Sequence, residues 1–221
     1  MNKKLLTPYI QPLLQKFKNM PWEDQDFYEQ YLAQTYYYTF HSTRMLALAA
    51  AFTSTSQENY YRRSLKHIAE EEGHEKIALN DLKRLGGNIE DHTELPTTKA
   101  FWQSQYYYID KENTSLLGYI LCLEWLAVDT FPDVYSKTLP LYSKASTNFI
   151  RVHAEEDPDH VDQCFEQIGA LPKDDQYMVM QNFIQSCRMF TLFMEEVEHS
   201  VKSDKYSKIP DRKSQVASPL G

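Results

Sequence analysis

Three residues in the second half of the chain, His153, Asp157 and His160, have the types and the spacing of a metal site. Spacings of four and three residues would place these side chains within roughly 60° of one another on an α-helix. Two imidazoles and a carboxylate hold ferrous iron and leave coordination positions open for dioxygen and substrate. Pro158 predicts a kink at Ala154, so the alternative is a solvated acidic turn between two helices.

A second group of potential ligands lies within residues 67–74. The side chains of His67, Glu70, Glu71 and His74 fall within about 100° of one another at 3.6 residues per turn. A glutamate three residues before a histidine is the pairing that carboxylate-bridged metal proteins direct inward from their helices. We therefore predict Glu71 and His74 as ligands. Glu70 or His67 could also be a ligand, either in place of Glu71 or beside it. The alternative is an ordinary charged surface helix.

A third feature is Glu124, which lies within the apolar residues 116–128, with no basic residue for several positions on either side. A carboxylate in such a segment must be paired, protonated or metal-bound, because burying it alone costs several kcal/mol or more. Binding a metal is the favoured interpretation. An ion pair with Arg44 or Arg151 is the structural alternative, and a protonated catalytic acid is a third interpretation with less support.

Together these segments supply three carboxylates and three histidines, a set suited to two iron ions: Glu71, His74, Glu124, His153, Asp157 and His160. The order Glu-x2-His, then an isolated glutamate, then His-x3-Asp-x2-His, resembles the haem-oxygenase-like diiron oxidases and oxygenases, the iron-containing redox enzymes. The resemblance spans about residues 25–200. It implies an all-α, haem-oxygenase-like bundle of about seven helices, with metals held by side chains instead of a porphyrin. Some members carry a further glutamate ligand where this chain has tyrosines or His67.

The helix expected before the first ligand group carries Tyr37, His41 and Arg44, which share a face by their spacing of four and three residues. Tyr37 and His41 are predicted to line the site as substrate-binding or proton-relay groups. Packing of most of these aromatic side chains with satisfied hydroxyls is the alternative.

These residues favour an oxygen-dependent enzyme that binds two Fe(II) ions, uses dioxygen as co-substrate, and oxidises or cleaves a small organic molecule. Glu71, His74 and His153 would hold one ion, and Asp157 and His160 the other, with Glu124 bridging or nearby. The first alternative is a haem protein of the same fold with His41 or another helix histidine as axial ligand. A second is a thiaminase-like hydrolase with Cys122 or Cys164 as nucleophile beside Glu124, and a third is a metal-free interaction protein.

The composition narrows the class of partner and the compartment. The chain has 221 residues and a formal charge of −8, which disfavours a nucleic-acid or anionic-membrane partner. Three widely spaced cysteines without a Cys-x-x-Cys pair predict free thiols in a reducing cytosol. Residues 1–17 lack the apolar run of a secretory signal, and the longest apolar runs, 45–52 and 116–123, are too short to span a bilayer. We expect a cytoplasmic protein, and a homodimer is common among related bundles.

The elements that must position the ligands are expected to be helices, because apolar residues recur with a period near 3.6 over most of the chain and strand signals are nearly absent. A domain of residues 1–201 and a polar tail of residues 202–221 are expected. The long helix after residue 24 should begin at a capping Asp24 or Asp26, and the one after residue 57 should end at Gly86. Pro132 and Pro140 are expected to bracket a break. The predicted helices cover residues 5–17, 24–52, 57–85, 98–109, 113–128, 141–168 with an interruption at Pro158, and 173–201.

Overall fold

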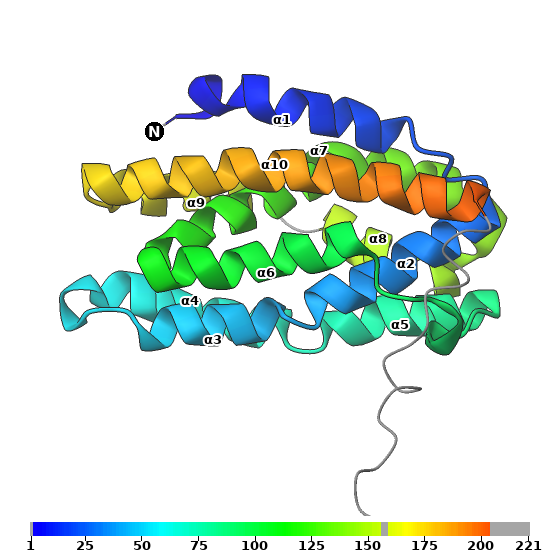
Figure 1. Ribbon diagram of the computed structural model, residues 1–221, viewed down its shortest axis with the longest axis horizontal. Coiled ribbons are helices and arrows are strands. Elements are labelled where there is room, and N and C mark those ends of the chain that lie inside the picture. Colours follow the sequence, from blue (N-terminus) through cyan, green and yellow to red (C-terminus); the bar gives the residue numbers. More distant parts are fainter. Residues whose placement is uncertain (1, 156–158, 204–221) are drawn as a thin grey trace, which may run out of the picture.

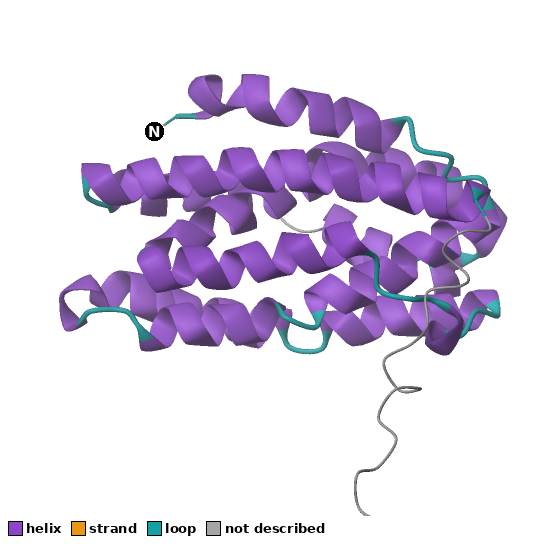
Figure 2. Ribbon diagram, viewed as in Figure 1, coloured by secondary structure: helices purple, strands orange, loops and turns teal. Residues whose placement is uncertain are grey.

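The computed structural model describes residues 2–155 and 159–203, and the side chains of Asp159 and His160 are not part of that description. The predicted tail therefore lies almost entirely outside the described residues. Within them the chain forms helices and no strand (Figures 1 and 2). The α-helices are α1 (Lys3–Lys18), α2 (Gln25–Thr39), α3 (Ser42–Ala51), α4 (Glu58–Glu71), α5 (His74–Leu85), α6 (Pro96–Lys111), α7 (Leu116–Tyr142), α8 (Asn148–Glu155), α9 (Asp159–Ala170) and α10 (Lys173–Lys202). Short 3-10 turns η1 (Thr55–Gln57), η2 (Ile89–Asp91), η3 (Asn113–Ser115) and η4 (Lys144–Ser146) join several of them.

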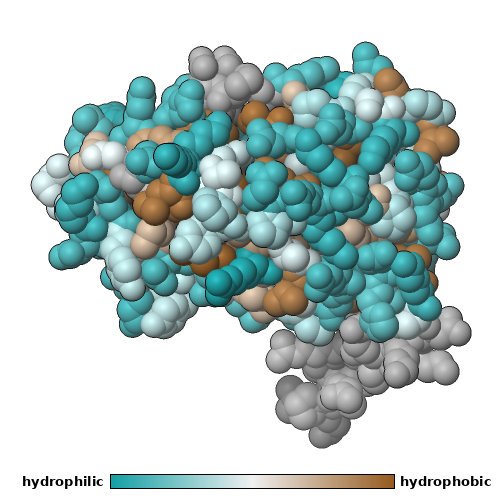
Figure 3. All heavy atoms as spheres, turned by 90° about the horizontal axis from the view of Figure 1, so that it is seen from above, coloured by the Kyte–Doolittle hydropathy of each residue, from teal (hydrophilic) through white to brown (hydrophobic). Residues whose placement is uncertain are grey.

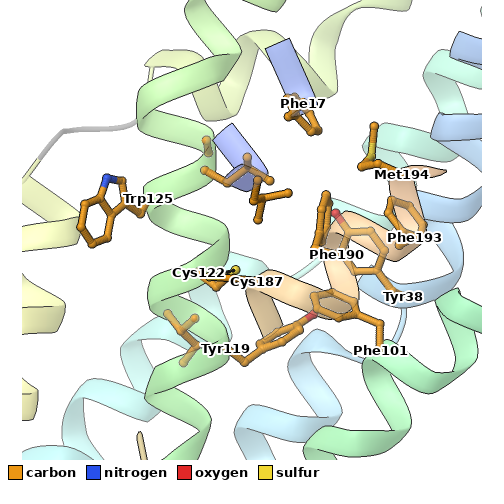
Figure 4. Close-up of a cluster of buried hydrophobic side chains, with 14 of the residues drawn as sticks. Phe17, Tyr38, Phe101, Tyr119, Cys122, Trp125, Cys187, Phe190, Phe193 and Met194 are labelled. Atoms are coloured by element: carbon orange, nitrogen blue, oxygen red, sulfur yellow. Dashed lines mark hydrogen bonds between the residues drawn. The ribbon is translucent and has the colours of Figure 1, made fainter. Parts of the chain in front are cut away.

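Two long helices form the centre of the bundle. The C-terminal helix α10 packs against α7, α1, α6 and α2, and α7 also packs against α8 and α9. Aromatic side chains from five helices meet in the core between them, where the Phe190 ring lies 5.3 Å from Phe101 and 6.0 Å from Tyr38 (Figure 4). The face of the molecule in Figure 3 is largely hydrophilic, with apolar side chains in separated groups. The expected all-helical fold is confirmed.

Local signals for helix ends are confirmed at two positions. The Asp24 carboxylate accepts hydrogen bonds from the backbone N–H groups of Asp26 and Phe27, so it is the residue that caps α2. Gly86 closes α5 with a φ of 101°, a left-handed conformation that glycine adopts without steric cost.

Two predicted continuous helices are each broken in the structure. The helix expected over residues 24–52 ends at Thr39, where the Thr39 hydroxyl donates to Thr35 O and His41 N donates to Tyr38 O, three residues back. The helix expected over residues 57–85 is interrupted because Glu72 is extended and Gly73 has a φ of 92°. These two breaks raise the number of segments above the predicted seven.

The expected break at Pro132 and Pro140 is absent, because α7 runs through both prolines to Tyr142. A proline within a helix costs about 3 kcal/mol, and the buried side chains of Phe131, Val134 and Tyr142 hold this part of α7 in the bundle. The next helix begins at Asn148 rather than at residue 141, after a turn in which Ser143 has a φ of 71°. Within the described residues, one helical stretch, Asn113–Tyr142, has the length and hydropathy to cross a membrane, and 78% of its most apolar window is buried in the bundle.

Candidate metal centre

The centre of the candidate site is formed by His67 and Glu71 from α4 and Glu124 from α7. One ligand atom from each of the three lies within 4.8 Å of the other two. His67 Nε2 is 3.6 Å from Glu71 Oε1 and 3.9 Å from Glu124 Oε1. All three side chains are at most one-fifth exposed. An imidazole and two carboxylates at this separation are a donor set that suits iron.

Two further histidines lie on the other side of Glu71. His74 Nδ1 is 3.6 Å from Glu71 Oε2, and the His74 and His153 ring centroids are 5.0 Å apart. His74 Nδ1 is buried and has no hydrogen-bond partner among the described residues. A buried imidazole nitrogen without a partner is costly, and a bound metal ion would satisfy it. The donor set therefore fits a metal on this side of Glu71 as well.

The orientation of His153 leaves one ring nitrogen available. His153 Nδ1 is 2.7 Å from the carbonyl oxygen of Phe149, one turn earlier on α8. A carbonyl oxygen only accepts hydrogen bonds, so Nδ1 must carry the proton. In the neutral ring the lone pair is then on Nε2, the arrangement usual for a histidine that binds a metal.

The break between α4 and α5 places His74 beside Glu71. Glu71 is the last residue of α4 and His74 the first residue of α5, and the turn between them depends on the left-handed Gly73. The preceding residues of α4 place His67 one turn before Glu71, so its imidazole meets the same carboxylate. Both oxygens of Glu71 thus face histidines, one from each helix.

The surrounding imidazoles control the charge of Glu71. Burial alone would raise its pKa, but the His67 hydrogen bond and the positive potential of His67, His74 and His153 lower the pKa below its ordinary value of 4.5. Glu71 is therefore ionised at neutral pH. Metal binding requires this ionised form of the carboxylate.

Two small cavities flank the pair of carboxylates and share Glu71 and Glu124 in their walls. One, of about 50 Å³, is otherwise lined by His67 and mainly apolar side chains, including Met45 and Tyr119. The other, of about 60 Å³, extends to His153 and is lined by aromatic side chains of α7, α8 and α10. Each has room for an ion with a few small ligands and is far smaller than the several hundred Å³ of a pocket for a large cofactor.

The other two predicted metal ligands, Asp157 and His160, cannot be placed in the site from the described residues. Asp157 lies outside the described residues, and of His160 the structure describes only the backbone, at the start of α9. Glu70 points away from the site, because it accepts a hydrogen bond from Arg63 Nη1 at 2.7 Å and lies 3.3 Å from Lys66 Nζ. Of the two residues left open as further ligands, His67 therefore lies in the candidate site beside Glu71, and Glu70 does not.

The predicted arginine partners of Glu124 are engaged elsewhere. Arg44 donates to the carbonyl of Phe40 and lies over its ring, and Arg151 pairs with Glu155 at 2.8 Å. His67, which lies near Glu124, is a potential metal ligand rather than a permanent cation.

Tyr37 and His41 do not line either cavity, which contradicts the expectation that they face the site. The Tyr37 hydroxyl donates to His92 O at 2.7 Å. The His41 ring stacks on Trp102 of α6 at 3.7 Å, and its Nδ1 is 3.2 Å from the Tyr106 hydroxyl. Tyr37 is still within α2 and faces the segment of residues 89–92. His41 follows the end of α2 at Thr39, and the turn there directs it toward α6.

Ser42 and Tyr119 line the site without having been singled out from the sequence. Tyr119 belongs to the same helix as Glu124 and precedes it by five residues, which is the only signal that the chain offers for its position. Ser42 is the first residue of α3, so the unforeseen break before it decides where its side chain lies.

The helical bundle has a haem-oxygenase-like fold, and its buried imidazoles and carboxylates form a candidate metal site. Residues 29–191 match the model of a family described as iron-containing redox enzyme, and the chain belongs to that family. No curated protein matches the chain.

Solved structures share the fold at low identity. A domain of unknown function with a heme oxygenase-like fold from Shewanella denitrificans OS217 is 21% identical, with a TM-score of 0.79 over 94% of this chain and 97% of that one. A TenA homolog from Pseudomonas syringae pv. tomato DC3000 is 14% identical, with a TM-score of 0.75 over 89% and 92% of the two chains. A TenA homologue from Pyrococcus furiosus is 11% identical, with a TM-score of 0.72 over 89% and 100%. At these identities the likeness concerns the fold.

Proposed function

We propose that this protein is a non-haem iron oxidase or oxygenase that binds two Fe(II) ions and uses dioxygen to oxidise or cleave a small organic molecule. The observation that carries the proposal is the meeting of His67, Glu71 and Glu124 within 4.8 Å, with His74 and His153 on the far side of Glu71. Membership of an iron-containing redox enzyme family supports the choice of metal.

The two oxygens of Glu71 suggest how the ligands divide. Oε1 faces His67, and Oε2 faces His74. We therefore assign Glu71 as the shared ligand, with His67 and Glu124 toward one ion and His74 and His153 toward the other. This division replaces the one expected from spacing, in which Glu124 was the bridging or neighbouring group. Asp157 and His160 remain predicted metal ligands.

Bound ferrous iron would supply the electrons that activate dioxygen. The protein contributes the dry surroundings, because Phe131, Phe149 and Phe190 line one cavity and Met45 and Ile120 the other. The Phe149 carbonyl holds the proton of His153 on Nδ1 and so fixes the ring. Glu71 stays ionised because of its neighbouring imidazoles, so it provides a negative charge without first losing a proton.

Anaerobic Fe(II) titration of the wild type and of two adjacent variants tests the proposal. Glu71→Gln should lower iron affinity at least tenfold, because it removes the charge and one ligand oxygen at the shared position. Glu70→Gln is the matched control, since Glu70 pairs with Arg63, and it should bind two equivalents like the wild type. Equal iron binding by the two variants, or none by the wild type, would refute the assignment.

The residues named for the other two enzyme classes, His41 and the two cysteines, are less suited to those roles. His41 stacks against Trp102 and faces neither cavity, so it is not placed to ligate a haem. Burial, with a smaller effect of Glu124, raises the pKa of the Cys164 thiol to about 12. Burial and the neighbouring Cys187 also raise the pKa of Cys122 well above its usual value. A thiol that stays protonated is a poor nucleophile, so neither cysteine suits a hydrolase.

A further inference from the structure

Two of the three cysteines meet in the core. Cys122 of α7 and Cys187 of α10 are free and completely or almost completely buried, and their sulfur atoms are 3.6 Å apart (Figure 4). Cys164 is also buried and free, but within the described residues it has no second thiol beside it. The chain therefore holds one dithiol and one single thiol.

The contact between the two sulfurs follows from a close approach of the two helices. One turn before Cys122, Gly118 leaves no room for a side chain, because a Cβ there would overlap the backbone of Val179 and Phe183. Phe183 is one turn before Cys187. At this separation of the helices, side chains as short as cysteine touch. The two sulfur atoms of a disulfide are about 2.05 Å apart. From the observed 3.6 Å, each sulfur atom would therefore have to move by less than about 1 Å to form the bond.

The dithiol lies close to the candidate metal centre through Tyr119. This residue is three positions before Cys122, on the same face of α7, and it lines the cavity that contains Glu71 and Glu124. Tyr119 therefore joins the helix face that carries Cys122 to the wall of the candidate site.

We propose that Cys122 and Cys187 are an internal two-electron donor that closes to a disulfide when dioxygen is consumed at the neighbouring iron site. Each thiol gives up one proton and one electron, and a sulfur–sulfur bond forms. Dioxygen takes up the two electrons and two protons and becomes hydrogen peroxide. The inference rests on the proposed function for its oxidant. Burial keeps both sulfur atoms away from external reagents, so an oxidant generated inside the bundle has the better access.

The test counts thiols in the full-length protein after an anaerobic load of Fe(II) and one exposure to dioxygen. The count is made after denaturation in acid, and intact mass and a peptide map identify any disulfide. The wild type should fall from three free thiols to one, with Cys122 joined to Cys187. Cys164→Ser is the matched control and should fall from two thiols to none. Cys122→Ser and Cys187→Ser should each keep both remaining thiols.

Two further measurements separate the possible failures. If the wild type binds iron and consumes dioxygen yet keeps three thiols, the electron-donor role is wrong and the proposed function stands. If it binds no iron, both proposals fail, and the metal analysis shows this directly. Incubation of the metal-free protein to equilibrium in glutathione mixtures tests closure alone. A folded, disulfide-containing state is expected there, and a disulfide found only in unfolded chains would overturn the proposal.

Discussion

Two consecutive glutamates at the end of α4 have different neighbours, because successive side chains on a helix point about 100° apart. Glu70 faces Arg63 and Lys66, whereas Glu71 faces the imidazoles of His67 and His74. Both carboxylates have a lowered pKa, in each case against the effect of burial. Only Glu71 owes this to groups that can also bind a metal. The identity of the neighbours, rather than the shift itself, distinguishes the candidate ligand from the surface ion pair.

Asp81 holds the helix that carries His153. Its fully buried carboxylate on α5 accepts a hydrogen bond from Phe149 N at 2.7 Å, and so satisfies one of the unpaired N–H groups at the start of α8. Burial raises the pKa of Asp81 from 3.8 to about 6, although the hydrogen bonds from Phe149 and Asn148 and the charge of Arg84 oppose the shift.

This raised pKa predicts a pH dependence of stability that Asp81→Asn should remove. Between pH 3.8 and about 6 the folded state holds a proton that the unfolded state has lost. The free energy of unfolding contributed by this group therefore falls as the pH rises through that window. Urea unfolding of metal-free wild type and Asp81→Asn, from pH 4 to 7, should show the wild type losing stability relative to the variant. Parallel curves would contradict the shift.

The packing of α7 on α10 depends on Gly118. A methyl group there would overlap the backbone of Val179 and Phe183, so Gly118→Ala should lower the free energy of unfolding by about 1–3 kcal/mol or more. Gly169→Ala is a matched control in α9, with no atom within 4 Å of the added carbon. It should stabilise the protein by up to about 1 kcal/mol, because alanine favours the helix. Urea unfolding measures both, and a loss of the same size in both variants would show that helix contact is not the cause.

Helix positions were predictable from periodicity, but helix breaks were not. The breaks at residues 40–41 and 72–73 depend on a threonine hydroxyl that bonds back to its own helix and on a glycine that takes a positive φ. Both residue types also occur inside helices. At Pro132 and Pro140 a break was predicted where the helix is continuous, because burial of α7 outweighs the local cost of a proline.

The same breaks decide which site residues were predictable. His67, Glu71 and His74 still meet, since the turn at Gly73 brings the start of α5 back to the end of α4. His41 was misplaced because the turn at Phe40 directs it to Trp102 of α6. Glu124 was recognisable from its apolar surroundings alone, whereas the cavity-lining position of Tyr119 depends on how the helices pack.

The donors of the candidate site come from four helices that are separate in the sequence, α4, α5, α7 and α8. None of these helices carries enough ligands to hold an ion alone. The unfolded chain would lose this arrangement, so iron should bind the folded state much more tightly than the unfolded one. Ligand binding of that kind stabilises the fold by mass action.

Fe(II) should therefore raise the melting temperature of this protein under anaerobic conditions. At a free iron concentration one hundred times the dissociation constant, one site stabilises the folded state by about 2.7 kcal/mol, which corresponds to a rise of roughly 5–11 °C for a chain of this size. Differential scanning calorimetry measures the shift, and a chelator should reverse it. Glu70→Gln should respond like the wild type, and Glu71→Gln should show little response, because the shared ligand between α4 and α5 is gone. An equal rise in both variants would mean that iron binds elsewhere on the acidic surface, and that the four helices are held together by their packing alone.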